Sequence, residues 1–164
     1  MFVVVLFNMS NIKFFYHTSF SLPEDKKTAE WLENVINHEK KNLFSLEYSF
    51  IGKEEMIRIN NKHLGHNYLT DVLSFDYSKN NDIYGEVFIC EAAVRSNAET
   101  LNEPFFTETN RVLVHGLLHL CGHNDKSSNE KEMMRALEEK YLSLISQGFP
   151  NHCIFVLSMF HVKP

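Results

Sequence analysis

The pattern of hydrophobic and polar positions divides the chain into short strand-like stretches and longer helical ones. Residues 12–18 alternate between hydrophobic and polar side chains and are rich in aromatic residues, which predicts a β-strand with one buried face. Three later stretches are rich in β-branched and aromatic residues and end at glycine or at polar runs. These stretches are residues 46–51, 70–75 and 83–90.

Hydrophobic residues recur every three or four positions in five other segments, which predicts helices. The segments are residues 22–41, 54–63, 91–101, 107–120 and 127–145. The second half of segment 107–120 is almost entirely apolar, so we expect it to be buried on all sides, with Gly122 as a left-handed cap. The last helix is expected to open at Ser128, which has Lys131 rather than an acid three residues on. The mixed order of elements predicts an α+β fold, a small mixed sheet of about four strands packed with helices.

The two ends of the chain depart from this pattern. The run 1–7 is apolar but lacks a basic n-region, and it is far shorter than the ~20 residues that span a bilayer. We therefore interpret residues 1–8 as an N-terminal extension rather than a signal peptide or membrane anchor. Residues 9–148 are predicted to form a single domain, and residues 149–164 a C-terminal tail without a clear period.

Charge and cysteine content restrict the possible partners and the compartment. The 164 residues carry a formal net charge of −5, whereas a protein that coats nucleic acid over a wide surface is strongly basic. Any contact with nucleic acid must therefore be local. The three cysteines, Cys90, Cys121 and Cys153, form no C-x-x-C pair, so we expect reduced thiols in a cytoplasmic protein.

The stretch HGLLHLCGHND, residues 115–125, predicts a metal site. His115 and His119 are four residues apart, so both imidazoles emerge from one face of the helix. After the turn at Gly122, Asp125 is expected to complete the site, and His123 is the competing third ligand. Three protein ligands and one open position are typical of catalytic zinc sites, although other divalent metals suit the same ligands.

The residue after His115 is Gly116, where zinc proteases of the H-E-x-x-H type carry their general base. This glycine argues against peptide hydrolysis. It either leaves room beside the metal for a phosphodiester or allows close helix packing. The same helix face continues back through Arg111 and Glu108. Arg111 could hold a phosphate and Glu108 could orient a ligand, or the two could form only a surface salt bridge.

The same stretch resembles the H-G-x-L-H-L-x-G-x-D-H signature of the YbeY family of bacterial rRNA-maturation endoribonucleases. Two more segments are similar to that family: T-D-V-L-S-F at residues 70–75 and G-E-V-F-I at residues 85–89, with Asn60 at its L-N element. The resemblance implies a zinc-dependent, single-strand-specific endoribonuclease. It also implies that the protein is cytoplasmic and that its partners are rRNA and the small ribosomal subunit. Its implied roles are 16S rRNA 3′-end maturation and ribosome quality control.

The chain departs from the family pattern at two positions. The third histidine of the signature falls at Asp125, which keeps a competent zinc ligand but adds a negative charge. The arginine of the family's Y-R element falls at Leu64, which removes a cation expected to bind RNA phosphate. His66 and Lys62 are the nearby residues that could substitute for it.

These residues lead to a hypothesis about mechanism. The metal would either activate an attacking water or polarise a phosphoryl oxygen while the RNA 2′-hydroxyl attacks. RNA is expected in a groove beside the metal, along residues 83–90, with Arg111, Lys62 and His66 near its backbone. The candidate catalytic residues are Arg111, Glu108 and His66, with Asp71 and Glu86 as further candidates for the general base.

Two other functions remain open. A non-catalytic small-subunit assembly factor with a structural metal would explain the loss of the arginine. A zinc peptidase or small-molecule hydrolase is disfavoured by Gly116.

Overall fold

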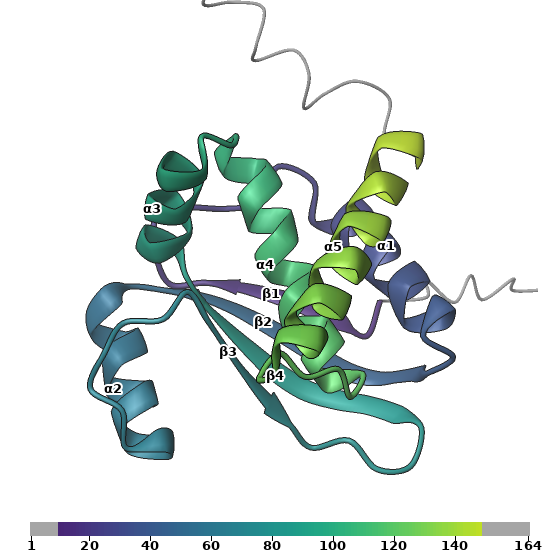
Figure 1. The fold of residues 1–164 in the computed structure, drawn as a ribbon, viewed down its shortest axis with the longest axis horizontal. Helices are drawn as coiled ribbons and strands as arrows, with labels where there is room; N and C mark the ends of the chain where they lie inside the picture. Colours follow the sequence, from purple (N-terminus) through teal and green to yellow (C-terminus); the bar gives the residue numbers. More distant parts are fainter. Residues whose placement is uncertain (1–9, 149–164) are drawn as a thin grey trace, which may run out of the picture.

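Four strands form one mixed sheet at the centre of a computed structural model that describes residues 10–148 (Figure 1). Their order across the sheet is β1-β2-β4-β3, with β1, β2 and β4 parallel and β3 antiparallel to β4. This confirms the predicted α+β class with a four-stranded mixed sheet. The strands are β1 (Ile12–Tyr16), β2 (Asn42–Ile51), β3 (Val72–Asp76) and β4 (Asp82–Cys90).

Five helices within residues 10–148 cover the sheet. Each lies inside its predicted segment or extends one to three residues beyond it. They are α1 (Asp25–His38), α2 (Lys53–Leu64), α3 (Glu91–Leu101), α4 (Phe105–Leu120) and α5 (Ser128–Gly148). Helices α1, α4 and α5 share the larger hydrophobic core with one face of the sheet, whereas α2 packs on the other face in a smaller cluster (Figure 1). The interpretations of residues 1–8 and 149–164, and of the Cys153 thiol, fall outside the described residues.

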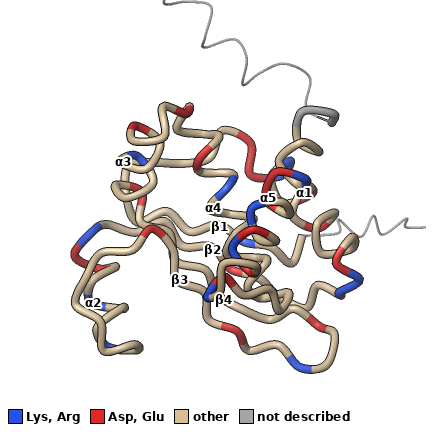
Figure 2. Tube along the Cα trace, in the orientation of Figure 1, with Lys and Arg blue, Asp and Glu red and all other residues tan. Residues whose placement is uncertain are grey.

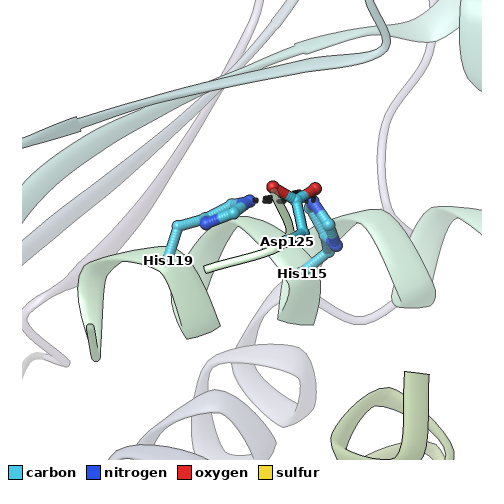
Figure 3. A group of neighbouring side chains, drawn as sticks. All are labelled: His115, His119 and Asp125. Carbon is cyan, nitrogen blue, oxygen red and sulfur yellow. Dashed lines mark hydrogen bonds and ion pairs between the residues drawn. The ribbon is translucent and has the colours of Figure 1, made fainter. Parts of the chain in front are cut away.

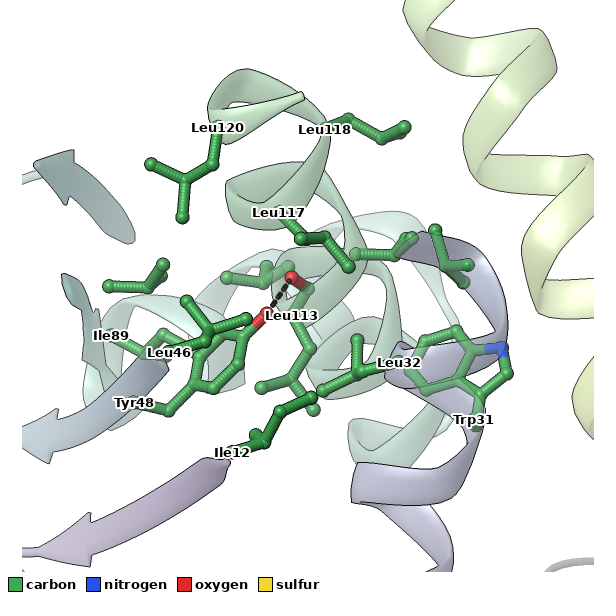
Figure 4. Close-up of a cluster of buried hydrophobic side chains, with 14 of the residues drawn as sticks. Ile12, Trp31, Leu32, Leu46, Tyr48, Ile89, Leu113, Leu117, Leu118 and Leu120 are labelled. Atoms are coloured by element: carbon green, nitrogen blue, oxygen red, sulfur yellow. Dashed lines mark hydrogen bonds between the residues drawn. The ribbon is translucent and has the colours of Figure 1, made fainter. Parts of the chain in front are cut away.

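The larger core holds α4 firmly against the sheet (Figure 4). Leu113 and Leu117 of α4 are fully buried against β2 and β4. Tyr48 of β2 is also fully buried, and its hydroxyl donates a hydrogen bond of 3.0 Å to the carbonyl of Leu113. Because a buried hydroxyl without a partner is costly, this bond favours one rotational setting of the helix.

Two glycines allow the close approach of α4 to β3 and β4. A β-carbon added to Gly116 would lie 2.7 Å from Cγ1 of Val87, and one added to Gly85 would lie 2.8 Å from Cδ1 of Leu120. Both separations are below van der Waals contact, so neither position accepts a side chain unless a neighbour moves. Of the two explanations offered for Gly116, close packing is therefore the one that the structure supports. The space that a side chain would fill already belongs to Val87.

Three local expectations were wrong. Helix α4 is not buried on all sides, because the side chains of His115 and His119 are 23% and 29% exposed. Strand β2 begins four residues earlier than predicted, since a bulge beside Phe44 breaks the alternation there. Helix α5 does open with a capping box, formed by Ser127 rather than Ser128: the Glu130 N–H donates to the Ser127 hydroxyl, and the Ser127 N–H donates to the Glu130 carboxylate.

Cys90 and Cys121 are buried and unbridged, as expected for small hydrophobic residues. Burial raises the pKa of the Cys121 thiol to about 12, so it is not a thiolate at neutral pH. Among the described helices, none is both long and apolar enough to cross a membrane.

Candidate metal centre

Two imidazole rings of α4 face each other on the exposed side of the helix. His115 and His119 lie one turn apart, and their Nε2 atoms are separated by 3.0 Å (Figure 3). The Nδ1 atom of His115 lies 2.7 Å from a carboxylate oxygen of Glu138, and Nδ1 of His119 lies 2.9 Å from the carbonyl oxygen of His123. Carboxylate and carbonyl oxygens only accept hydrogen bonds, so both Nδ1 atoms carry hydrogen. In the neutral rings, two Nε2 lone pairs therefore point at each other.

Two lone pairs at this distance repel unless a cation or a proton lies between them. Burial lowers the pKa of His115, but the hydrogen bond and charge of Glu138 outweigh burial and raise it above its usual value. Burial and the neighbouring His115 lower the pKa of His119. Of the two rings, His115 therefore holds a second proton more readily than His119, and a proton on its Nε2 would compete with a metal for that atom.

The turn after α4 brings a carboxylate to the same point. The N–H of Gly122 donates a hydrogen bond of 3.0 Å to the carbonyl of His119, and the N–H of His123 donates one of 3.0 Å to the carbonyl of Leu118. These two bonds form a Schellman motif. Gly122 has a φ of 101°, which suits glycine. One oxygen of Asp125 then lies 3.9 Å from Nε2 of both histidines (Figure 3).

The three side chains have the spacing that a tetrahedral metal requires. Bonds of ~2.0–2.1 Å place the ligand atoms of such a metal roughly 3.4 Å apart. The observed separations of 3.0 Å and 3.9 Å lie on either side of this value, and the three ligand atoms fall within 4.8 Å of one another. The donor set of two imidazoles and one carboxylate therefore fits a divalent cation such as Zn²⁺.

The side chain of His123, the competing third ligand, points elsewhere. Its Nε2 lies 2.7 Å from a carboxylate oxygen of Glu39, the residue that follows α1. The hydroxyl of Tyr141 on α5 donates to the other oxygen of Glu39. His123 thus contributes its backbone carbonyl to His119, and its ring ties the turn to α1 and α5.

An open cleft of about 430 Å³ adjoins the three candidate ligands. Strand β3 and the two residues before it form most of the wall, because β3 is the edge strand next to α4. None of the described residues of β4 lines this cleft, so the expectation of a groove along residues 83–90 was wrong. The lining residues are Thr70, Asp71, Val72, Leu73, Ser74, Asp76, His115, His119, Leu120 and Asp125.

The candidate catalytic residues do not line the cleft. Arg111 lies 3.1 Å from Glu108 and 3.6 Å from Glu138, and Glu108 is only 3% exposed, so this is a half-buried network rather than a surface pair. Burial raises the pKa of Glu108 although Arg111 opposes the shift. His66 is exposed on the loop after α2, stacked on Tyr68.

The two further candidates for the general base differ in position. Asp71 lies in the wall of the cleft, where one carboxylate oxygen accepts a hydrogen bond of 2.9 Å from Asn97. Glu86 points to the opposite face of the sheet, since its neighbours Gly85 and Val87 contact α4. Its carboxylate accepts a hydrogen bond of 2.8 Å from Tyr77 on that face.

Sequence reasoning missed Glu138, which holds His115, and Glu39, which holds the turn through His123. Glu138 is 6% exposed on the buried side of α5, between Met134 and Tyr141. An acid on the apolar stripe of an amphipathic helix is the signal that could have identified it, because a buried carboxylate needs a partner. Glu39 follows the helical segment directly and gives no such signal.

Known proteins are similar to this chain in sequence and in fold. The family model described as Endoribonuclease YbeY matches residues 16–146. A protein named Endoribonuclease YbeY from Flavobacterium johnsoniae is 41% identical over 133 residues, which cover 81% of this chain and 96% of that protein. The protein of the same name from Phocaeicola vulgatus is 41% identical over 121 residues, which cover 74% of this chain and 88% of that protein.

The fold is also similar to the solution structure of TM1509 from Thermotoga maritima. That likeness has a TM-score of 0.63 at 25% sequence identity, and it covers 83% of this chain and 90% of that one.

Proposed function

This chain belongs to the endoribonuclease YbeY family, and on that premise we propose that it is a zinc-dependent endoribonuclease which cleaves single-stranded RNA in the cleft beside His115, His119 and Asp125. The observation that carries the proposal is the pair of opposed Nε2 atoms with a carboxylate 3.9 Å from both. The cleft leaves this group open to a substrate on the β3 side.

The residues of the site have complementary roles in this proposal. A bound Zn²⁺ would act as a Lewis acid that activates a water or polarises a phosphoryl oxygen. His115, His119 and Asp125 hold the cation and leave the site with a net charge of about +1, which suits an anionic substrate. Glu138 keeps the hydrogen of His115 on Nδ1, so that Nε2 stays free to bind.

Three further residues are proposed to assist the reaction from outside the wall of the cleft. Arg111 and Glu108 form a charged network with Glu138, and through it they set the orientation of His115. His66 is exposed on the loop between α2 and β3, where it can meet an RNA strand that leaves the cleft. Asp71, which does lie in the wall of the cleft, is proposed to take a proton.

We propose rRNA as the substrate, with a role in 16S rRNA 3′-end maturation and in ribosome quality control on the small subunit in the cytoplasm. The net charge of −5 supports a local contact rather than a broad one. Figure 2 agrees with this, because acidic and basic positions are interleaved along the described chain.

The test combines metal analysis with cleavage of labelled single-stranded RNA. We expect about one zinc per chain, cleavage that stops with a chelator, and loss of both in His115→Ala and His119→Ala. The matched control is His17→Ala, which should behave as wild type. His17 is exposed and directly follows β1. If both variants keep their zinc, the site assignment is wrong.

A second candidate function is a small-subunit assembly factor whose metal is structural. The specific observation in its favour is Leu64, which is 51% exposed at the end of α2 where family members carry an arginine. Zinc that is bound stoichiometrically, together with no cleavage of any single-stranded RNA, would support this function over the nuclease.

A further inference from the structure

A second hollow of about 390 Å³ lies beside the metal cleft. The two share Thr70 and Asp71 in their walls, so a chain that leaves the cleft past these residues enters the hollow. Its other walls come from the start of α2, the loop before β3 and the first turns of α3. The remaining lining residues are Lys53, Leu69, Ala92, Ala93, Ser96 and Asn97.

The hollow offers two kinds of surface. Leu69, Ala92 and Ala93 provide a small apolar side in a lining that is mostly polar. Lys53 provides an exposed ammonium group that forms no ion pair with any described residue. Asp71 is the acid in the wall, and one oxygen of its carboxylate is engaged by Asn97 at 2.9 Å. A flat apolar group and an anion beside it would both find partners here.

Two stacked aromatic rings lie on the loop before β3, whose residue Leu69 lines the hollow. Tyr68, directly before Leu69, is 58% exposed and stacks on His66 with ring centroids 5.1 Å apart and planes 20° from parallel. The Tyr68 hydroxyl and Nδ1 of His66 are also 3.1 Å apart, within hydrogen-bond distance. Asn60 on α2 donates a hydrogen bond of 2.9 Å to the Tyr68 carbonyl, which anchors the loop. Exposed aromatic rings held in place are a stacking surface for unpaired bases.

We propose that this hollow, together with Tyr68 on the loop that carries Leu69, is a subsite for a nucleotide of single-stranded RNA next to the one that is cut. The base stacks on Tyr68 and the apolar side of the hollow, while Lys53 contacts the neighbouring phosphate. This inference rests on the proposed nuclease function. It also accounts for selectivity toward single strands, because a base paired in a duplex cannot present its face to Tyr68.

The subsite would also replace part of the phosphate contact expected from the family arginine that is absent at Leu64. Leu64 supplies no charge at the end of α2, whereas Lys53 supplies one at the start of the same helix. Binding would then depend on stacking as well as on charge, in keeping with the acidic balance of the chain.

The test measures the affinity of the zinc-loaded chain for short labelled RNA in Tyr68→Ala, Tyr68→Phe and Lys53→Ala. Tyr68→Ala should bind roughly 5- to 100-fold more weakly, and Tyr68→Phe, which keeps the ring, should bind as wild type. Lys53→Ala should reduce the slope of log affinity against log salt by about 0.7, the value for one phosphate of a single strand. Tyr84→Ala and Lys13→Ala are the controls, since both residues lie on exposed strand positions outside both hollows.

RNA with one abasic nucleotide locates the stacked base. At one position next to the cleavage point, the abasic RNA should weaken binding to wild type and leave the affinity of Tyr68→Ala unchanged. If wild type cleaves RNA but Tyr68→Ala and Lys53→Ala bind as tightly as their controls, the subsite is refuted and the nuclease function stands. A wild-type chain that neither binds nor cleaves RNA refutes the proposed function, and this inference with it.

Discussion

The carboxylate of Glu138 lies 2.7 Å from Nδ1 of His115, although the two residues are 23 positions apart on different helices. The other oxygen of the same carboxylate lies 3.6 Å from Arg111. Helix α5 must therefore be docked on α4 before the histidine pair has its final orientation. The geometry of the candidate metal centre depends in this way on the packing of two helices, not only on the motif that carries its candidate ligands.

Glu138→Gln should weaken zinc binding by roughly 10- to 100-fold, because a carboxylate partner raises the basicity of a metal-binding imidazole. The amide keeps the shape but removes the charge. Zinc affinity is measured by competition with a chromophoric chelator. Glu139→Gln, one residue on and exposed, is the matched control and should keep wild-type affinity. Equal affinities in the two variants would show that Glu138 has only a structural role.

Gly116→Ala should lower the free energy of unfolding by about 1–3 kcal/mol, the usual cost of overpacking a core. The added β-carbon would lie 2.7 Å from Cγ1 of the fully buried Val87. This loss is expected even though alanine favours a helix interior over glycine by ~1 kcal/mol. Urea denaturation measures it.

The matched control for Gly116→Ala is a double-mutant cycle with Val87→Ala. Removing Cγ1 of Val87 relieves the clash, so the double variant should lose less stability than the two single losses add up to. Strict additivity would mean that the glycine is not required for close packing of α4.

Stability at acid pH should depend on Glu39. Burial raises the pKa of this carboxyl, but the hydrogen bonds from His123 and Tyr141 and the nearby charge of Lys140 outweigh burial, so the folded pKa lies below 4.5. A lowered folded pKa contributes stability that is present above the unfolded value and lost as pH falls through the folded one. Glu39→Gln should therefore be less stable than wild type at pH 7, and its stability should fall less steeply as the pH is lowered. Thermal unfolding as a function of pH measures both effects. The exposed Glu99→Gln should follow wild type throughout.

Leu64→Arg should raise the affinity for single-stranded RNA and steepen its salt dependence by about 0.7 in slope, the effect of one more phosphate contact. The position tolerates a long polar side chain because Leu64 is 51% exposed. Leu101→Arg is the control, because it adds the same charge at another place. Leu101 is 56% exposed at the end of α3. The same gain in both variants would reflect net charge alone and exclude a specific role for position 64.

Local periodicity was enough to predict the strands and helices and to expect His115, His119 and Asp125 close together. Strand and helix patterns depend on neighbouring residues, so every strand and helix of residues 10–148 was located, with differences of up to four residues at their ends. His115 and His119 share a face because a helix repeats every 3.6 residues. Asp125 could be placed near them because the Schellman turn at Gly122 is itself local.

Only the tertiary structure decided which groups surround that motif. Pairing of β2 with β4 puts β3 at the edge of the sheet. The cleft is therefore lined by residues 70–76 and not, as expected, by residues 83–90. Glu39 reaches His123 across 84 positions in the chain. Such contacts follow from how all the buried faces pack at once. A pattern read along a single segment therefore carries no information about them, whereas it does specify the segment's own helix, strand or turn.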